Sequence, residues 1–149
     1  MGNESEPWAA QVRSLLERAA EAFDAGHSCE GLIDQAFELV DREGSKEHPM
    51  FGSLVCFAAD VAESAGATDA AAALYKRAYD VWLPFGSQAN AFVVLALCGL
   101  ARADVARNWL GRARERYTEA LNLLDKLDHP DEHGRRTQIA QALEALTDG

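Results

Sequence analysis

An alanine recurs every 42 residues in this chain of 149 residues, at Ala36, Ala78 and Ala120. Bulky side chains accompany each alanine at matching positions, namely Ile33, Tyr75 and Tyr117 before it and Phe37, Tyr79 and Leu121 after it. A fixed period of this length is typical of chains built from stacked structural units. Each unit exposes an apolar face that only its neighbours can cover, so the period predicts a row of units around one continuous core.

The same interval relates a second set of small or apolar residues outside the alanine segments. Its members are Val55 with Leu97 and Ile139, Ala58 with Leu100 and Ala142, Ala59 with Ala101, and Gly66 with Asn108 at a turn. The first unit has a shorter turn than the second, and terminal units are often irregular because one side faces water.

The hydrophobic pattern predicts an all-α fold, because no stretch alternates apolar and polar residues for long and β-branched residues are few. Turn-forming residues mark the ends of the predicted helices, which cover about residues 7–25, 30–43, 49–65, 68–83, 88–107, 110–127 and 131–147. Thr68 and Asp69 are expected to cap the fourth helix, and Asn108, which tolerates a positive φ, to end the fifth.

The short connections between these helices predict that consecutive helices pack antiparallel. Residues 1–149 are therefore expected to form a single domain. Its units cover about residues 7–44, 49–84 and 87–127, and a capping helix follows over residues 131–147.

The acidic side chains are concentrated in the amino-terminal half of the chain. Residues 1–74 carry 4 basic and 14 acidic side chains, a net charge of −10, whereas residues 75–149 carry 10 of each. An acidic surface repels polyanions, so nucleic acid is not expected as a partner. Acidity that simply keeps the protein soluble is the simpler explanation of this charge.

Cysteine usage and hydropathy indicate a cytoplasmic protein. The three cysteines are an odd number without the spacing of a disulfide framework, and the amino terminus lacks the pattern of a secretory signal. The longest apolar run, residues 89–101, is interrupted by Asn90 and is too short to span a bilayer. No membrane association is therefore expected.

The arrangement resembles the tetratricopeptide repeat family. In that family the first helix of each pair carries a large and then a small residue, and the second carries alanine, an aromatic residue and alanine. The matching residues are Val55, Ala59, Ala71, Tyr75 and Ala78 in the second unit, and Leu97, Ala101, Ala113, Tyr117 and Ala120 in the third. The period exceeds the usual length of about 34 residues and is similar to the extended repeats of kinesin light chains. Ala62 and Asp104 depart from the pattern, since the family usually has an aromatic residue there.

The resemblance implies a right-handed superhelical array of antiparallel helix pairs, with about three repeats and a carboxy-terminal capping helix. A helical array of another kind is the alternative. In the family, the first helices of the pairs line a concave groove. That groove would contain Arg13, Leu16 and Phe23 from the first unit, Ser53, Cys56, Asp60, Glu63 and Ser64 from the second, and Leu95, Cys98, Arg102 and Val105 from the third.

These groove residues indicate which ligand would suit the groove. The best-known groove of the family holds a peptide carboxyl terminus with Lys, Asn and Arg side chains. This chain has no Lys or Asn in those places, so an acidic tail is not expected. Asp60 and Glu63 above an apolar floor favour an amphipathic segment that bears Arg or Lys. The alternative is that both carboxylates belong to a solvated helix face.

Catalysis, metal binding and cofactors find no support in the sequence. It contains no Gly-rich phosphate loop after a strand and no nucleophile elbow. His27 and Cys29 supply too few ligands for zinc. His129 and His133 could hold a metal from one helix, but they stand in a predicted loop with a helix breaker on each side, so a metal is not expected there. Cys56 and Cys98 occupy equivalent places in two units, which favours small buried side chains over a catalytic role.

A run of arginines marks the third unit, at Arg102, Arg107, Arg112, Arg114 and Arg116. These side chains could pair within the chain, bind an acidic partner, or meet the acidic amino-terminal half of another copy in head-to-tail association. Trp109 lies beside the predicted turn and would be a natural contact residue if it is exposed.

The leading hypothesis is a non-catalytic adaptor or chaperone-like module that binds a peptide or helix of a partner protein in the groove. One alternative is a self-assembling structural or complex-assembly protein that forms homo-oligomers through its helix ends and convex face. Another is a ligand-sensing or enzymatic helical domain.

Overall fold

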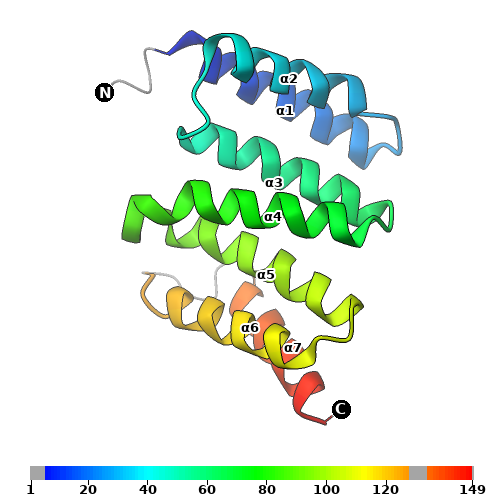
Figure 1. Cartoon of the computed structure of the whole chain (residues 1–149), viewed down its shortest axis with the longest axis vertical. Helices are drawn as coiled ribbons and strands as arrows, with labels where there is room; N and C mark the ends of the chain where they lie inside the picture. Colours follow the sequence, from blue (N-terminus) through cyan, green and yellow to red (C-terminus); the bar gives the residue numbers. More distant parts are fainter. Residues whose placement is uncertain (1–5, 128–133, 149) are drawn as a thin grey trace.

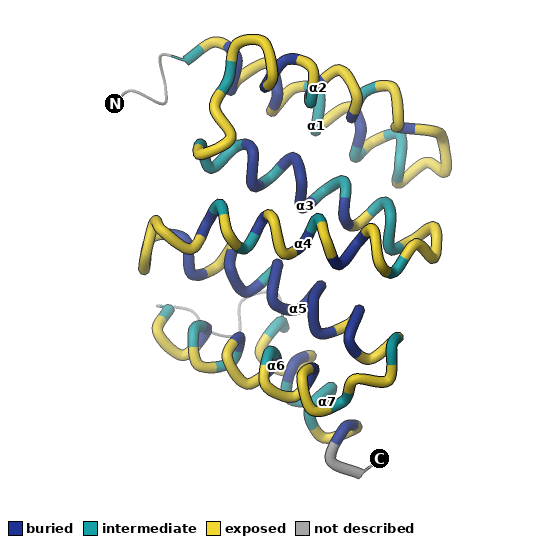
Figure 2. Tube along the Cα trace, viewed as in Figure 1, coloured by how far each residue is buried: buried dark blue, intermediate teal, exposed yellow. Residues whose placement is uncertain are grey.

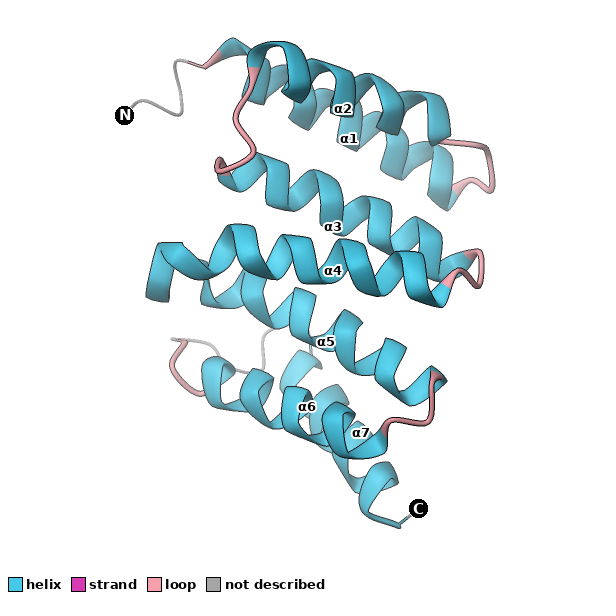
Figure 3. Ribbon diagram, viewed as in Figure 1, coloured by secondary structure: helices cyan, strands magenta, loops and turns pink. Residues whose placement is uncertain are grey.

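The computed structural model describes residues 6–127 and 134–148, and these residues contain helices and no strand. The all-α prediction is therefore confirmed (Figure 3). The helices are α1 (Pro7–Asp24), α2 (Glu30–Glu43), α3 (Pro49–Ser64), α4 (Thr68–Trp82), the 3-10 helix η2 (Leu83–Ala89), α5 (Asn90–Ala106), α6 (Leu110–Leu124) and α7 (Arg135–Asp148).

The helices are stacked in chain order, with α1 and α2 at one end and α6 and α7 at the other (Figure 1). The turns alternate between the two edges of the stack, so consecutive helices run antiparallel. Helix α3 packs on α4, α4 also packs on α5, and α5 packs on α6. Helix α1 contacts α3 as well as α2, and α7 packs on α6. The right-handed superhelix stays a prediction.

The periodic alanines are buried in the core between the helices. Ala36, Ala78 and Ala120 have no exposed surface, and neither do Ala59 and Ala101 on the preceding helices. A methyl group is the smallest side chain that still shields the backbone, so alanine lets two helices approach closely without leaving a void. Figure 2 shows the result, since α5 is buried along most of its length and α3 alternates between buried and half-buried residues.

Left-handed residues end three of the helices. Gly26 and Gly66 have φ values of 79° and 80°, and Asn108, the equivalent of Gly66, has a φ of 64°. The prediction for Asn108 is confirmed. The expected cap at Thr68 and Asp69 is wrong, because Ala67 is the N-cap and no side chain caps this helix.

Two other helix boundaries differ from the prediction. Residues 83–89 form η2, in which Gly86 has a φ of 67°, so α5 begins at Asn90 and not at residue 88. The positive φ of Gly86 breaks the α-helical path after the Trp82–Leu83 segment. Helix α6 ends at Leu124, three residues before the predicted end. The predicted start of the last helix, residue 131, lies outside the described residues.

His48 caps helix α3, which the sequence did not predict. Its Nδ1 atom accepts a hydrogen bond of 3.0 Å from the backbone N–H of Met50. Its Nε2 atom lies 3.0 Å from Oε2 of Glu6, and its ring meets Trp8 edge-on with 4.8 Å between centroids. This contact ties the start of α1 to the start of α3.

Two glycines make room for aromatic rings between helices. A Cβ atom at Gly99 in α5 would lie 2.5 Å from the Tyr75 ring of α4. A Cβ atom at Gly52 in α3 would lie 2.5 Å from the indole of Trp82, whose Nε1–H donates to the Pro49 carbonyl at 3.2 Å. Each glycine is therefore required by close approach of a buried ring and not by backbone conformation.

A buried ion pair distinguishes the third unit from the second. The carboxylate of Asp104 in α5 is fully buried, and its Oδ2 atom lies 3.0 Å from Nη1 of Arg116 in α6. Its Oδ1 atom has no hydrogen-bond partner within the described part of the chain. The equivalent residues of the second unit are Ala62 and Leu74, both packed against the core. The same pair of positions on neighbouring helices thus holds two apolar residues in the second unit and an ion pair in the third.

We predict that Gly99→Ala lowers the free energy of unfolding by about 1–3 kcal/mol, because the new methyl group would overlap the Tyr75 ring. Gly111→Ala in α6 is the matched control, since a methyl group added there would meet nothing within 4 Å. Because Gly111 lies in the first turn of α6, this control should leave stability unchanged or raise it by up to about 0.5 kcal/mol. Urea unfolding followed by circular dichroism measures both, and equal stability of the two variants would contradict the close packing.

We also predict that Arg116→Leu destabilises the protein by about 3–5 kcal/mol, because it leaves the buried Asp104 carboxylate without its cation. The double variant Asp104→Ala/Arg116→Leu restores the residue types of the second unit. It should be at least as stable as the wild type to within about 1 kcal/mol. Chemical unfolding of the wild type, both single variants and the double variant completes the cycle. A double variant as unstable as Arg116→Leu would refute this account of the pair.

Candidate functional site

The predicted groove residues Asp60, Glu63 and Arg102 meet in one polar cluster on three consecutive helices. Asp60 and Glu63 lie one turn apart on α3, and Arg102 lies on α5. Asp60 and Arg102 are equivalent positions of neighbouring units, so the stacking of α3 and α5 brings opposite charges to adjacent places. Tyr75 of α4 reaches between them and completes the cluster.

The Tyr75 hydroxyl is the centre of the cluster. Its oxygen lies 2.5 Å from Oδ1 of Asp60 and 2.8 Å from Oε1 of Glu63, and it accepts a hydrogen bond of 3.2 Å from Nη2 of Arg102. Because the hydroxyl has one proton, it donates to one carboxylate at a time. Arg102 also holds Glu63 with two bonds, of 2.7 Å from Nε and 3.0 Å from Nη2.

The two carboxylates of the cluster have opposite electrostatic environments. Partial burial, more than any other cause, raises the pKa of Asp60, although the Tyr75 hydrogen bond and the charge of Arg102 oppose this shift. The hydrogen bonds from Arg102 lower the pKa of Glu63. Burial and the two neighbouring carboxylates raise the pKa of Tyr75, so its hydroxyl keeps its proton. Glu63 therefore forms the ion pair with Arg102. The negative charge of Asp60 is less fully balanced by a neighbouring positive charge.

A small cavity of about 190 Å³ opens beside the cluster between α4 and α5. Glu63, Tyr75 and Arg102 contribute its polar lining. The remaining lining residues are small or lack charge: Thr68, Ala71, Gly99, Ala103 and Ala106. A space of this size and character suits an apolar side chain with a polar group at its edge.

The other predicted groove residues lie outside the cluster. Cys56 and Cys98 are buried, and burial followed by the charge of Asp60 raises the pKa of the Cys56 thiol to about 12. Burial and the raised thiol pKa make these cysteines small apolar side chains of the core and not reactive thiols. Ser53 and Leu95 are half-buried on α3 and α5. On α1, Arg13 is exposed and Leu16 is half-buried against the core.

Sequence reasoning missed the role of Tyr75. The resemblance matched Tyr75 to the aromatic residue of the second helix, but its hydroxyl had no assigned partner, because partners on two other helices depend on the tilt between hairpins. The pairing of Arg102 with Glu63 was missed for the same reason. The only signal in the sequence was that opposite charges stand at equivalent positions of successive units.

No group of three or more His, Cys, Asp or Glu side chains could hold a metal ion among residues 6–127 and 134–148. His27 is exposed in the turn after α1, while the neighbouring Cys29 is buried. His129 and His133, the other pair considered in the sequence, lie outside the described residues. All three cysteines are free thiols.

One helical stretch of the described chain, Thr68–Ala106, is long and apolar enough to cross a membrane by length and composition. It comprises α4, η2 and α5, and 67% of its most apolar window is buried inside the structure. Core helices of soluble proteins have the same property, so this finding decides little about localisation.

No protein-family model matches the sequence, and no curated protein or solved structure matches the chain. The resemblance to tetratricopeptide repeats therefore remains a prediction.

We predict that Glu63→Gln lowers stability by up to about 1 kcal/mol at pH 7, because an ion pair this exposed is strongly screened by solvent. The lowered pKa of Glu63 means that its stabilisation is present above the ordinary carboxyl pKa and is lost as the pH falls through the folded value. The difference between wild type and variant should therefore vanish in acid. Denaturant unfolding curves of wild type and variant, recorded between pH 3 and pH 7 in steps of about one pH unit, measure this difference in stability.

Asp60→Asn is the matched control for this prediction. The raised pKa of Asp60 favours the protonated carboxyl in the fold, a contribution that is lost as the pH rises through the folded value. Asparagine keeps an acceptor for Tyr75 and removes the poorly compensated charge. It should therefore leave stability at pH 7 unchanged or higher. A loss equal to that of Glu63→Gln would contradict the assignment of separate roles.

Proposed function

We propose that this protein is a non-catalytic interaction module of the cytoplasm that binds a helix or extended segment of a partner protein along the face formed by α1, α3 and α5. One observation carries the proposal. Asp60, Glu63 and Arg102, which the resemblance to tetratricopeptide repeats assigned to one groove, converge at the Tyr75 hydroxyl beside a small cavity lined by both polar and apolar side chains. The three unpaired cysteines support a reducing compartment.

The distribution of charge in the cluster indicates which segment would bind. Glu63 already has a two-bond partner in Arg102, whereas the carboxylate of Asp60 receives a hydrogen bond from Tyr75. A basic side chain of the partner would complete the compensation of Asp60. An apolar side chain one helical turn away would enter the cavity beside Tyr75. The ligand is therefore an amphipathic segment bearing Arg or Lys.

The partner segment can be identified with a photo-crosslinking amino acid placed at Ser53, on the proposed face. Ala73, exposed on the outward side of α4, is the control position. Crosslinking in the native host, followed by peptide mass spectrometry, should yield one segment from Ser53 and not from Ala73. The same segment from both positions would place binding elsewhere.

The affinity of variants for that segment then tests whether Asp60 binds a basic side chain and whether the cavity holds an apolar one. Asp60→Lys is expected to weaken binding at least about tenfold, because it sets like charges against each other. Ala106→Leu should weaken binding comparably by filling the cavity, whereas Ala73→Leu on the outward side of α4 should not. Isothermal titration calorimetry measures all three. Unchanged affinity for Asp60→Lys and Ala106→Leu would end the proposal.

A further inference from the structure

The turn between α5 and α6 carries an exposed tryptophan that the fold does not require. Trp109 is 45% exposed and is the N-cap of α6, with φ −96° and ψ 68°. The equivalent N-cap of α4 is Ala67, with φ −87° and ψ 73°. Two units therefore build the same turn, one with alanine and one with tryptophan. Backbone geometry and core packing do not explain the larger residue.

Two arginines flank this tryptophan, and both replace alanines of the second unit. Arg107 stands where the second unit has Ala65, and Arg112 stands where it has Ala70. The guanidinium carbon of Arg107 lies 4.7 Å from the centre of a Trp109 ring, and that of Arg112 lies 5.3 Å away. We call Arg107, Trp109 and Arg112 the arginine–tryptophan patch.

Contacts within the protein fix the side chains of the arginine–tryptophan patch before any partner binds. Asp69 fixes Arg107 with bonds of 2.7 and 3.1 Å, and cation–π contacts hold the three side chains together. Within residues 6–127 and 134–148, no carboxylate pairs with Arg112. Tryptophan and arginine dominate the binding energy of protein interfaces, and a preformed patch loses little entropy on binding. Its positive charge calls for an acidic partner surface.

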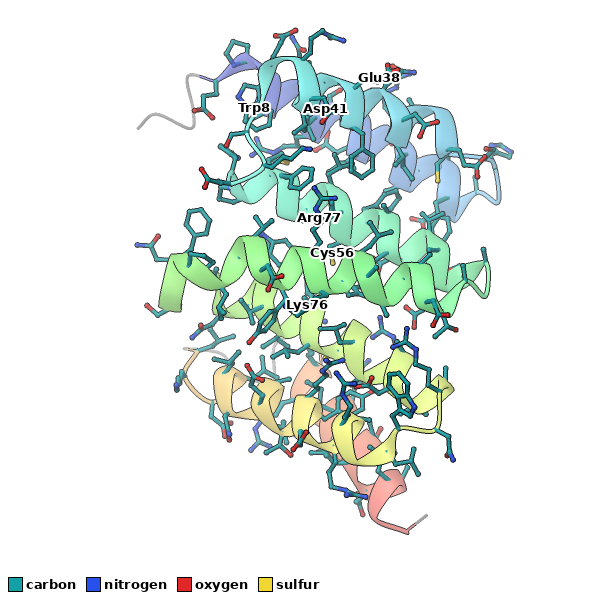
Figure 4. All side chains as sticks on the ribbon, viewed as in Figure 1. Trp8, Glu38, Asp41, Cys56, Lys76 and Arg77 are labelled. Atoms are coloured by element: carbon teal, nitrogen blue, oxygen red, sulfur yellow. The ribbon has the colours of Figure 1, made fainter. Side chains whose placement is uncertain are left out.

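Such a surface exists at the other end of the same chain. Helix α2 carries four exposed acidic residues that recur every three or four positions on one face: Glu30, Asp34, Glu38 and Asp41. Glu38 and Asp41 lie on α2 at the end of the stack, and Asp41 has Lys46 nearby at 3.6 Å (Figure 4). A groove of about 380 Å³ between α1 and α2 adjoins Glu38, and Leu15 and Leu39 lie in its otherwise polar lining, which also includes Arg18 and Arg42. This groove can receive an indole ring.

We propose that the arginine–tryptophan patch of one molecule docks on the acidic face of α2 in a second copy of this chain. The patch lies at the α5–α6 turn on one edge of the stack and α2 lies at the far end, so the two surfaces do not meet within one molecule (Figure 1). The arginines of the patch and the carboxylates on the exposed face of α2 carry opposite charges, so the two surfaces are complementary. Because the two surfaces differ, the contact is head-to-tail; successive copies close into a ring if the rotation between them permits and otherwise form an open chain.

The test is sedimentation velocity and light scattering over a roughly hundredfold range of protein concentration. The average mass of the wild type should rise above the 16.2 kDa of one chain without stopping at a dimer. Trp109→Ala/Arg112→Ala, which restores the alanines of the second unit, should weaken association at least about tenfold. Asp34→Asn/Glu38→Gln should do the same by removing two of the four negative charges on the exposed face of α2.

A mixture of these two double variants gives the decisive result. Each retains one intact surface, so together they should form a 1:1 complex that cannot grow further. Phe92→Ala and Lys76→Ala are the matched controls, since they remove an equally exposed aromatic residue and an exposed cation away from the patch, and both should associate as the wild type does.

Three results would overturn the proposal. They are a wild type that stays monomeric throughout, association that survives in both double variants, and a mixture that fails to form the 1:1 complex. A monomeric wild type that binds a glutamate-rich peptide through Trp109 would identify an acidic partner protein as the occupant instead.

Discussion

The close approach of helices at small residues is the constraint on which the rest of this structure depends. Ala36, Ala78 and Ala120 have no exposed surface, and a side chain larger than methyl at any of them would push two helices apart. Glycine extends the same principle at Gly99, where the backbone of α5 lies directly against the Tyr75 ring. That contact sets the distance at which the Tyr75 hydroxyl can reach α3 and α5 together.

The repeated units act as internal controls for one another, since the same backbone positions carry different side chains. Ala62 and Leu74 fill one place with apolar atoms, whereas Asp104 and Arg116 fill the equivalent place with a buried ion pair. Ala67 and Trp109 cap equivalent helices with nearly the same backbone angles. Packing and backbone geometry alone explain the apolar pair Ala62 and Leu74 and the capping residue Ala67 of the second unit. The residue of the third unit needs a further reason, which identifies it as a candidate for specificity or function.

The candidate site was partly predictable. Periodic spacing placed Asp60, Glu63 and Arg102 on first helices of neighbouring pairs, and the structure brings them within hydrogen-bond distance of one hydroxyl. The periodic spacing did not predict that Glu63 forms an ion pair with Arg102, nor that His48 caps α3 and contacts Trp8. Both features join residues far apart in the chain, and their geometry depends on how one hairpin tilts against the next.

The sequence by itself determined the all-helical character, the positions of most turns and the identity of the buried faces. These properties depend on local periodicity and on residues such as Asn108 that accept a positive φ. Only the tertiary structure decided which charges meet and which stay free: Glu63 with Arg102, Asp104 with Arg116, and Arg112 against Trp109 without a described carboxylate. The physical reason is that a side-chain contact across helices varies within a few ångströms of displacement, whereas burial of a helix face tolerates such displacement.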